Sequence, residues 1–210
     1  AILTIPLCVT SLVDNGEDKW FLIRTIGPIL GIALLIHQSG KILNPRPLDT
    51  LAILAIAWIG MQLLSMPGTM NTGMSLAVIT RQIGFLSFFF IVRYFARDQT
   101  RVLKLLYTLI LLGLVTSTYG VFQHFGYDMI DWDIHVEIPA ERGISFMGHA
   151  TFAASMLILI IPIAITIAIT QKSHAAKSFA ALSSLVMLYH LSFSGARVAT
   201  VVLFLAAVIA

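Results

Sequence analysis

The sequence predicts an all-α, polytopic membrane bundle, and its composition and its long apolar runs both support this fold class. Hydrophobic residues make up 58% of the 210 residues, against about 45–50% in an ordinary soluble domain. Charged residues make up 11%, where about 25% is usual. A soluble fold of this size has too little polar surface to cover so much apolar area. The composition therefore excludes a soluble enzyme, a disordered tail and a disulfide scaffold.

Apolar runs long enough to cross a bilayer recur along the whole chain. A membrane-spanning helix needs about 20 mainly apolar residues. Such runs occupy residues 1–13, 20–37, 50–66, 75–95, 102–122, 150–170, 178–193 and 198–210. We therefore expect seven to eight spans, in three regions: N-terminal helices over 1–122, an outer loop over 123–149, and a second helical region over 150–210. Because the last run stops without a polar end, we expect the chain to be a fragment.

The loops between these runs alternate in charge. One set comprises residues 38–49, 93–104 and 171–177, and it carries eight of the thirteen Lys and Arg residues. The opposite set comprises residues 14–19, 67–74, 123–149 and 194–197, and it carries three basic residues and eight of the ten acidic residues. The positive-inside rule assigns the first set to the cytoplasm. We expect a cytoplasmic N-terminus and an outward-facing 123–149 segment.

The outer segment 123–149 is the longest stretch between predicted spans. Within it, apolar and polar residues alternate over 132–138 until Pro139, which is typical of an extended strand-like segment. Tyr127 and Trp132 are residue types that favour the headgroup level. We therefore expect this segment to lie along the outer membrane surface.

Three arginines are predicted to reach the outer side, which otherwise carries few basic residues. Arg81 lies within the 75–95 run, Arg142 precedes the 150–170 run, and Arg197 begins the last run. Because guanidinium groups bind phosphate in a bidentate fashion, a shared site for an anionic oxygen ligand would explain all three. The alternatives are snorkelling of Arg81 to the headgroups and a plain interfacial loop around Arg142.

Small residues and hydroxyls accompany two of these arginines. They are Gly143, Ser145 and Gly148 after Arg142, and Ser194 and Gly195 before Arg197. Stretches of this kind let backbone N–H groups approach a ligand closely. We therefore count them as near the predicted anion site.

For the remaining histidines, the cysteine and the helix glycines, the sequence favours structural roles over catalytic or metal-binding ones. His149 lies at the outer face, and we count it as near the predicted site, where it could contact the acceptor or carrier. His190 lies within a span next to Ser192. Taken individually, each histidine is more simply a hydrogen-bonded group at a helix end. The histidine spacing does not match a metal site, and the one cysteine, Cys8, forms no internal disulfide. Gly113 and Gly120 give one helix face the small residues that favour close helix packing.

Two motifs in the second half of the chain resemble the O-antigen ligase and O-antigen polymerase family. The first is Arg-Gly-Ile-Ser-Phe-Met-Gly-His-Ala-Thr-Phe-Ala-Ala-Ser-Met-Leu over 142–157, which opens a span after an outward loop. The second is Ser-Phe-Ser-Gly-Ala-Arg-Val-Ala over 192–199, one hairpin later. The resemblance covers about 140–205. The family commonly has Asn or Gln near the position of His149, so this chain departs from the pattern there.

The resemblance implies a membrane glycosyltransferase of the bacterial inner membrane that acts on the periplasmic face. Such enzymes move a glycan from an undecaprenyl-diphosphate carrier to lipid A core, to another glycan repeat or to a protein, without a nucleotide sugar, metal or other cofactor. It implies that Arg142 and Arg197 hold the diphosphate. Arg81 lies outside the resemblance, and we expect it to assist only as part of the shared anion site described above. It also implies that the catalytic His lies in a later periplasmic loop, beyond Ala210, so that the fragment alone would be inactive.

Other functions remain open on the sequence alone. Within the same family, a polysaccharide polymerase is the alternative to a ligase. From other classes, the alternatives are a transporter or flippase of polysaccharide and a structural subunit whose arginines anchor lipid headgroups. The predicted partners are the lipid-linked donor, a lipid or glycan acceptor and membrane lipids. The few, scattered charges do not indicate a nucleic-acid partner.

Overall fold

The computed structural model describes residues 25–26, 28–30, 50–96, 98–130 and 143–209, without the side chains of Phe95 and 204–209. Within these residues, every regular element is a helix. The longer helices are α3 (Thr50–Ser65), α4 (Thr72–Phe95), α5 (Gln99–His124), α6 (Ala150–Thr170), α7 (His174–Phe193) and α8 (Arg197–Ile209). Two 3₁₀ turns, η1 (Met66–Gly68) and η2 (Ser145–Met147), complete the set. The predicted span over 1–13, all of the predicted span over 20–37 except residues 25–26 and 28–30, the extended segment over 132–138, and Arg142 lie outside the described residues.

Four helical segments are long and apolar enough to cross a membrane. They are Thr50–Gly68, Thr72–Tyr94, Gln99–His124 and Ala150–Thr170. α7 carries several polar side chains and α8 has only 13 residues, so neither reaches the same combination of length and apolarity. The all-α class is confirmed, and the chain has four candidate membrane helices in the described part. The expected total of seven to eight spans stays a prediction.

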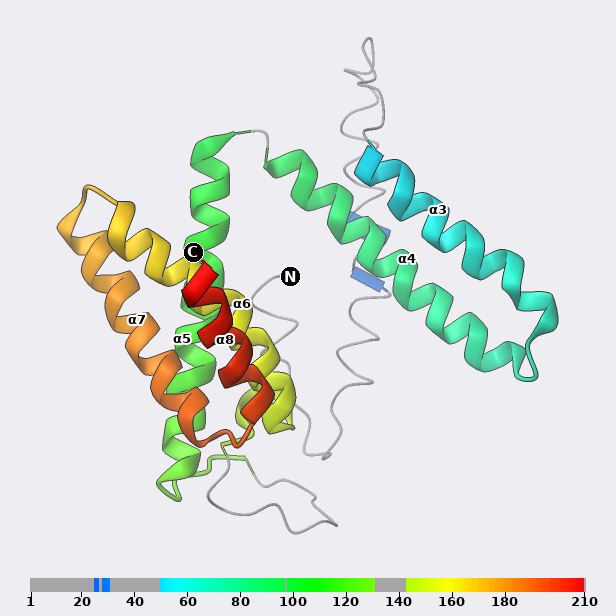
Figure 1. Cartoon of the computed structure of the whole chain (residues 1–210). Coiled ribbons are helices and arrows are strands. Elements are labelled where there is room, and N and C mark those ends of the chain that lie inside the picture. The colour runs from blue at the N-terminus through cyan, green and yellow to red at the C-terminus, as the bar shows by residue number, and fades with distance from the viewer. Residues whose placement is uncertain (1–24, 27, 31–49, 97, 131–142, 210) are drawn as a thin grey trace. The chain divides into compact units, whose positions relative to one another are not determined.

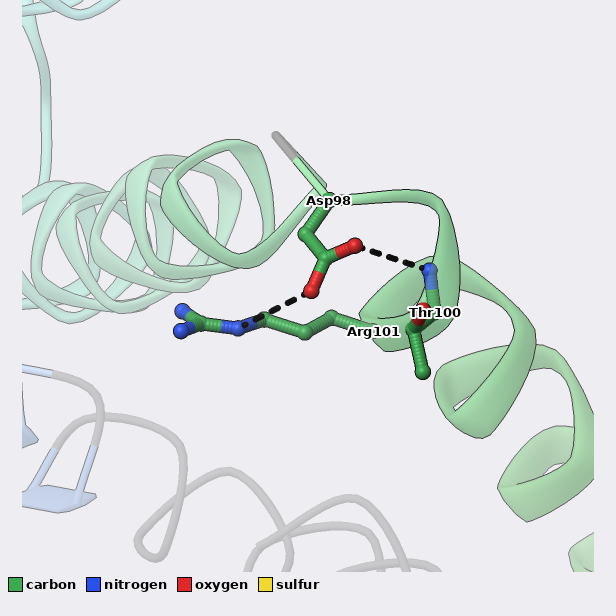
Figure 2. Close-up of polar contacts among 3 residues, drawn as sticks. All are labelled: Asp98, Thr100 and Arg101. Carbon is green, nitrogen blue, oxygen red and sulfur yellow. Dashed lines mark hydrogen bonds and ion pairs between the residues drawn. The ribbon is translucent and has the colours of Figure 1, made fainter.

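Two helices begin three residues before their predicted spans because polar residues cap them. Asn71 accepts a hydrogen bond from the N–H of Met74 (3.0 Å) and so starts α4 at Thr72. Asp98 accepts one from the N–H of Thr100 (3.0 Å), just before α5 (Figure 2). Apolar periodicity locates the buried stretch of a helix, whereas the cap satisfies its first N–H groups and sets where it starts.

The ion pair in Figure 2 adds little to the stability of this helix start. The Nε of Arg101 lies 3.6 Å from Oδ2 of Asp98, and both side chains are about half exposed. Exposed pairs of this kind contribute about 1 kcal/mol at most. The helix start therefore depends mainly on the cap.

The chain divides into two compact units. The unit over 20–102 contains α3 and α4, which form a hairpin through η1 (Figure 1). The other unit comprises 1–19 and 103–210 and contains most of α5 together with α6, α7 and α8. The second unit carries the sequence motifs and most of the predicted site residues.

The α5–α8 unit has one apolar core. α6 and α7 pack along each other as an antiparallel pair, and α8 packs against both (Figure 1). Buried core residues come from all four helices, among them Ile110, Leu157, Met187 and Ala199. We call the end of this unit where α5 and α7 end and α6 and α8 begin the site end; it is the lower end in Figure 1.

The predicted close packing along α5 is confirmed. A Cβ added to Gly113 would lie 2.5 Å from Sδ of Met187, and one added to Gly120 would lie 2.3 Å from Nε2 of His190. Both contacts are with α7, so the two glycines let α7 approach the backbone of α5. The second contact lies near the site end.

Candidate anion-binding site

The loop before α6 is fastened to α5 by Ser145. The backbone N–H of Ser145 donates to Oε1 of Gln123 (2.5 Å), and its hydroxyl donates to the carbonyl of Thr116 (2.6 Å). Ser145 is fully buried and Gln123 nearly so. Buried hydrogen bonds are costly to leave unmade, so these two contacts hold the loop in one place.

The network extends from Gln123 to Asp128, just beyond the end of α5. The Gln123 amide donates to Oδ2 of Asp128 (3.0 Å), and the Tyr119 hydroxyl donates to Oδ1 of the same carboxylate. The N–H of Ile130 also donates to that oxygen (3.2 Å). We call Thr116, Tyr119, Gln123, Asp128 and Ser145 the polar network. It connects the C-terminal part of α5 with Asp128, just beyond that helix, and with Ser145 in the loop before α6.

An aromatic pair supports the same loop. The rings of Tyr119 and Phe146 stack with centroids 4.3 Å apart and planes inclined by 18°. Offset stacking of aromatic rings contributes about 0.5–1.5 kcal/mol beyond the area that it buries. Tyr119 therefore holds the loop through its ring as well as through its hydroxyl.

Two residues of the loop have left-handed backbone conformations. Gly148 (φ 70°) ends η2 at no steric cost. Ser145 is the one described non-glycine residue with positive φ (54°), a conformation that costs roughly 1–2 kcal/mol. The two hydrogen bonds of Ser145 offset that cost. The loop is thus held by its contacts in a conformation that it would not adopt alone.

His149 caps α6. Its Nδ1 accepts a hydrogen bond from the N–H of Thr151 (3.2 Å), and the side chain is exposed. A ring nitrogen that accepts carries no proton, so the neutral ring has its proton on Nε2. His149 therefore offers a hydrogen-bond donor to a ligand at this end.

Arg197 is exposed and begins α8 at the site end. Ser194 is buried and accepts from the N–H of Ala196 (3.3 Å), and Gly195 has φ 71°. Ala196 precedes α8 and has no polar side chain to cap the helix. The first turn of α8 contains no acidic residue. The guanidinium and the positive end of the helix dipole therefore reinforce each other.

The predicted site residues fall into three groups. Gly143, Ser145 and Gly148 are buried in the loop before α6, Ser194 and Gly195 lie between α7 and α8, and Arg197 is the first residue of α8, all at the site end. Arg142 lies outside the described residues, but it precedes the buried Gly143 in the chain. Arg81 lies in the other unit, half-buried on α4, about 14 Å along the helix from its start at the usual rise per residue.

The sequence prediction missed the residues that hold the loop. Thr116, Tyr119 and Gln123 recur at intervals of three and four, which gives α5 a polar stripe on one face toward its end. That periodicity is visible in the sequence. The periodicity does not reveal which residues bond to this stripe. Ser145, for example, lies 22 residues from its partner Gln123.

No known protein family, curated protein or solved structure matches the chain. Its function must therefore be argued from the chemistry of the site. Within the described residues, no group of three His, Cys, Asp or Glu side chains is placed to hold a metal ion. What gathers at the site end is an exposed arginine, two helix N-termini and a fastened loop that follows a second arginine.

Proposed function

We propose that the protein is a membrane glycosyltransferase that moves a glycan from an undecaprenyl-diphosphate carrier to a lipid or glycan acceptor, in the manner of an O-antigen ligase. One observation carries the proposal. The loop containing Gly143 and Ser145 is buried and hydrogen-bonded to α5, at the same end of the bundle where Arg197 is exposed. A diphosphate needs donors that are already in position, and a fastened loop next to Arg142 supplies one side of such a site.

The chemistry that these groups would assist is the departure of the carrier. The acceptor hydroxyl oxygen bonds to the anomeric carbon, the bond from that carbon to the diphosphate oxygen breaks, and its electrons leave with the diphosphate. Arg142 and Arg197 would stabilise the negative charge that grows on the leaving oxygens. The first N–H groups of α8 would add to this stabilisation.

The acceptor proton must pass to a base, and neither His149 nor His190 suits this role. The Nδ1 of His149 is occupied and its Nε2 carries the proton. His190 has no exposed surface. The proposal therefore leaves the base to a residue outside this site, in keeping with the resemblance noted above.

Reconstituted transfer tests the proposal directly. The full-length protein in vesicles, given a glycan on undecaprenyl diphosphate and a lipid A core acceptor, should form the glycolipid and release one undecaprenyl diphosphate per glycan. No nucleotide sugar should be needed, and EDTA should not inhibit the reaction. Glycan lengthening on the carrier in place of transfer to lipid A core would favour a polymerase. Glycan crossing the bilayer with its carrier bond intact would contradict transfer and favour a transporter.

The proposal also requires the site end to face away from the cytoplasm, with seven to eight spans in the bacterial inner membrane. In a Cys8→Ser background, a membrane-impermeant maleimide should label Tyr127→Cys in intact spheroplasts, because Tyr127 is 69% exposed beyond the end of α5. Ser173→Cys, in the turn between α6 and α7, should be labelled only after permeabilisation. The reverse labelling pattern would place the arginines in the cytoplasm and contradict the proposed function.

A further inference from the structure

His190 connects α7 to the loop that follows Arg142. Its side chain is fully buried, and its Nε2 lies 3.2 Å from the carbonyl oxygen of Gly143, 47 residues away in the sequence. A carbonyl oxygen only accepts hydrogen bonds, so Nε2 carries the proton and donates. The histidine is thus a buried donor that links α7 to the loop.

The contact allows little freedom because two glycines surround it. A Cβ on Gly120 would lie 2.3 Å from Nε2 of His190, and a Cβ on Gly143 would lie 2.4 Å from the carbonyl oxygen of Gly120. α5, α7 and the loop therefore meet at van der Waals distance at this point. A shift of the imidazole ring would have to move the loop or α5.

The other buried polar residues of α7 behave differently. Ser183 donates to the carbonyl of Phe179 (2.7 Å) and Ser184 donates to that of Ala181 (2.8 Å), both within their own helix. A buried polar side chain costs free energy unless it is paired. Among the buried polar residues of α7, only His190 forms its hydrogen bond with the loop. Packing within α7 alone therefore does not explain why a polar side chain is buried at this position.

We propose that His190 is a positioning residue for the diphosphate site. Its hydrogen bond fixes the peptide between Gly143 and Ile144, and so holds the described start of the loop that leads into α6 at the site end. The ring has no exposed surface, so it acts through the loop and does not touch substrate. This inference rests on the proposed function, because it names a residue that supports that same site.

The expected signature is weaker binding of the carrier. His190→Leu removes the donor and leaves the Gly143 carbonyl without it, which should raise the KM for the lipid-linked donor about tenfold and change kcat by less than about twofold. His190→Gln should restore the KM, because its amide nitrogen is as many bonds from Cα as Nε2 of histidine. His190→Asn is one bond shorter and should not restore it.

Hydrogen–deuterium exchange provides a readout of the loop itself. In the full-length protein, His190→Leu should speed exchange of the Ile144 and Ser145 amides, and His190→Gln should return them to the wild-type rate. Ser183→Ala is the matched control, since it removes a buried hydrogen bond from the same helix without touching the loop. It should leave both the KM and the loop exchange unchanged.

The outcomes separate the two proposals. If the wild type binds no undecaprenyl diphosphate, the proposed function is overturned. If the wild type binds it and His190→Leu keeps the wild-type KM, the positioning role alone is overturned. Should His190→Leu fail to accumulate in the membrane, the comparison of His190→Gln with His190→Asn decides: equal KM values for these two variants would also overturn the role.

Discussion

Replacing Arg142 or Arg197 by alanine is expected to abolish glycan transfer while leaving the protein inserted in the membrane. Removal of one preorganised donor from a charge-stabilising site typically slows the reaction about 100- to 1,000-fold. Arg197 is exposed at the first position of α8, so its side chain is not needed for packing of the core. The loss should therefore appear in the rate of transfer and not in the amount of protein.

Substitution by lysine sharpens this test. Arg197→Lys keeps the charge but loses the planar, bidentate geometry that suits phosphate oxygens. It should have activity between those of the wild type and the alanine variant. Lys172→Ala, an exposed basic residue between α6 and α7 at the other end of the bundle, is the control and should transfer normally. Normal surface glycan in both arginine-to-alanine variants would refute the site.

The second large effect is expected at Gly143. An added Cβ would lie 2.4 Å from the carbonyl oxygen of Gly120 and within 3.2 Å of its Cα. Both are backbone atoms of a helix and cannot rotate away. Overpacking of this kind costs about 1–3 kcal/mol, and we expect Gly143→Ala to fall at the upper end. The loop should move away from α5, and transfer should fall with the stability.

Two other glycines make matched controls for thermal unfolding of the purified protein. Gly113→Ala would bring a Cβ to 2.5 Å from Sδ of Met187, the flexible part of a side chain that can shift, so its cost should be smaller. Gly60→Ala meets nothing within 4 Å inside α3 and should leave stability unchanged or raise it by up to about 1 kcal/mol. An unfolding midpoint of Gly143→Ala equal to that of Gly113→Ala would contradict the close approach.

The helices were predictable from the sequence because apolar runs and caps are local features. The run at 150–170 coincides with α6, whereas α4 and α5 begin three residues early at the caps formed by Asn71 and Asp98. Gly113 and Gly120 predict close helix packing, although the sequence does not say that α7 is the partner. Those features depend only on neighbours within a few turns of helix.

Which groups share the site end, and what holds them there, depended on the tertiary structure. The sequence by itself determined an all-α membrane chain and singled out Arg197 and the small residues from Gly143 to Gly148. It did not indicate that Gln123 holds Ser145, or that His190 reaches the carbonyl of Gly143. These contacts join residues 22 and 47 positions apart, and they form only when the packed helices bring buried donors and acceptors together and exclude water from them.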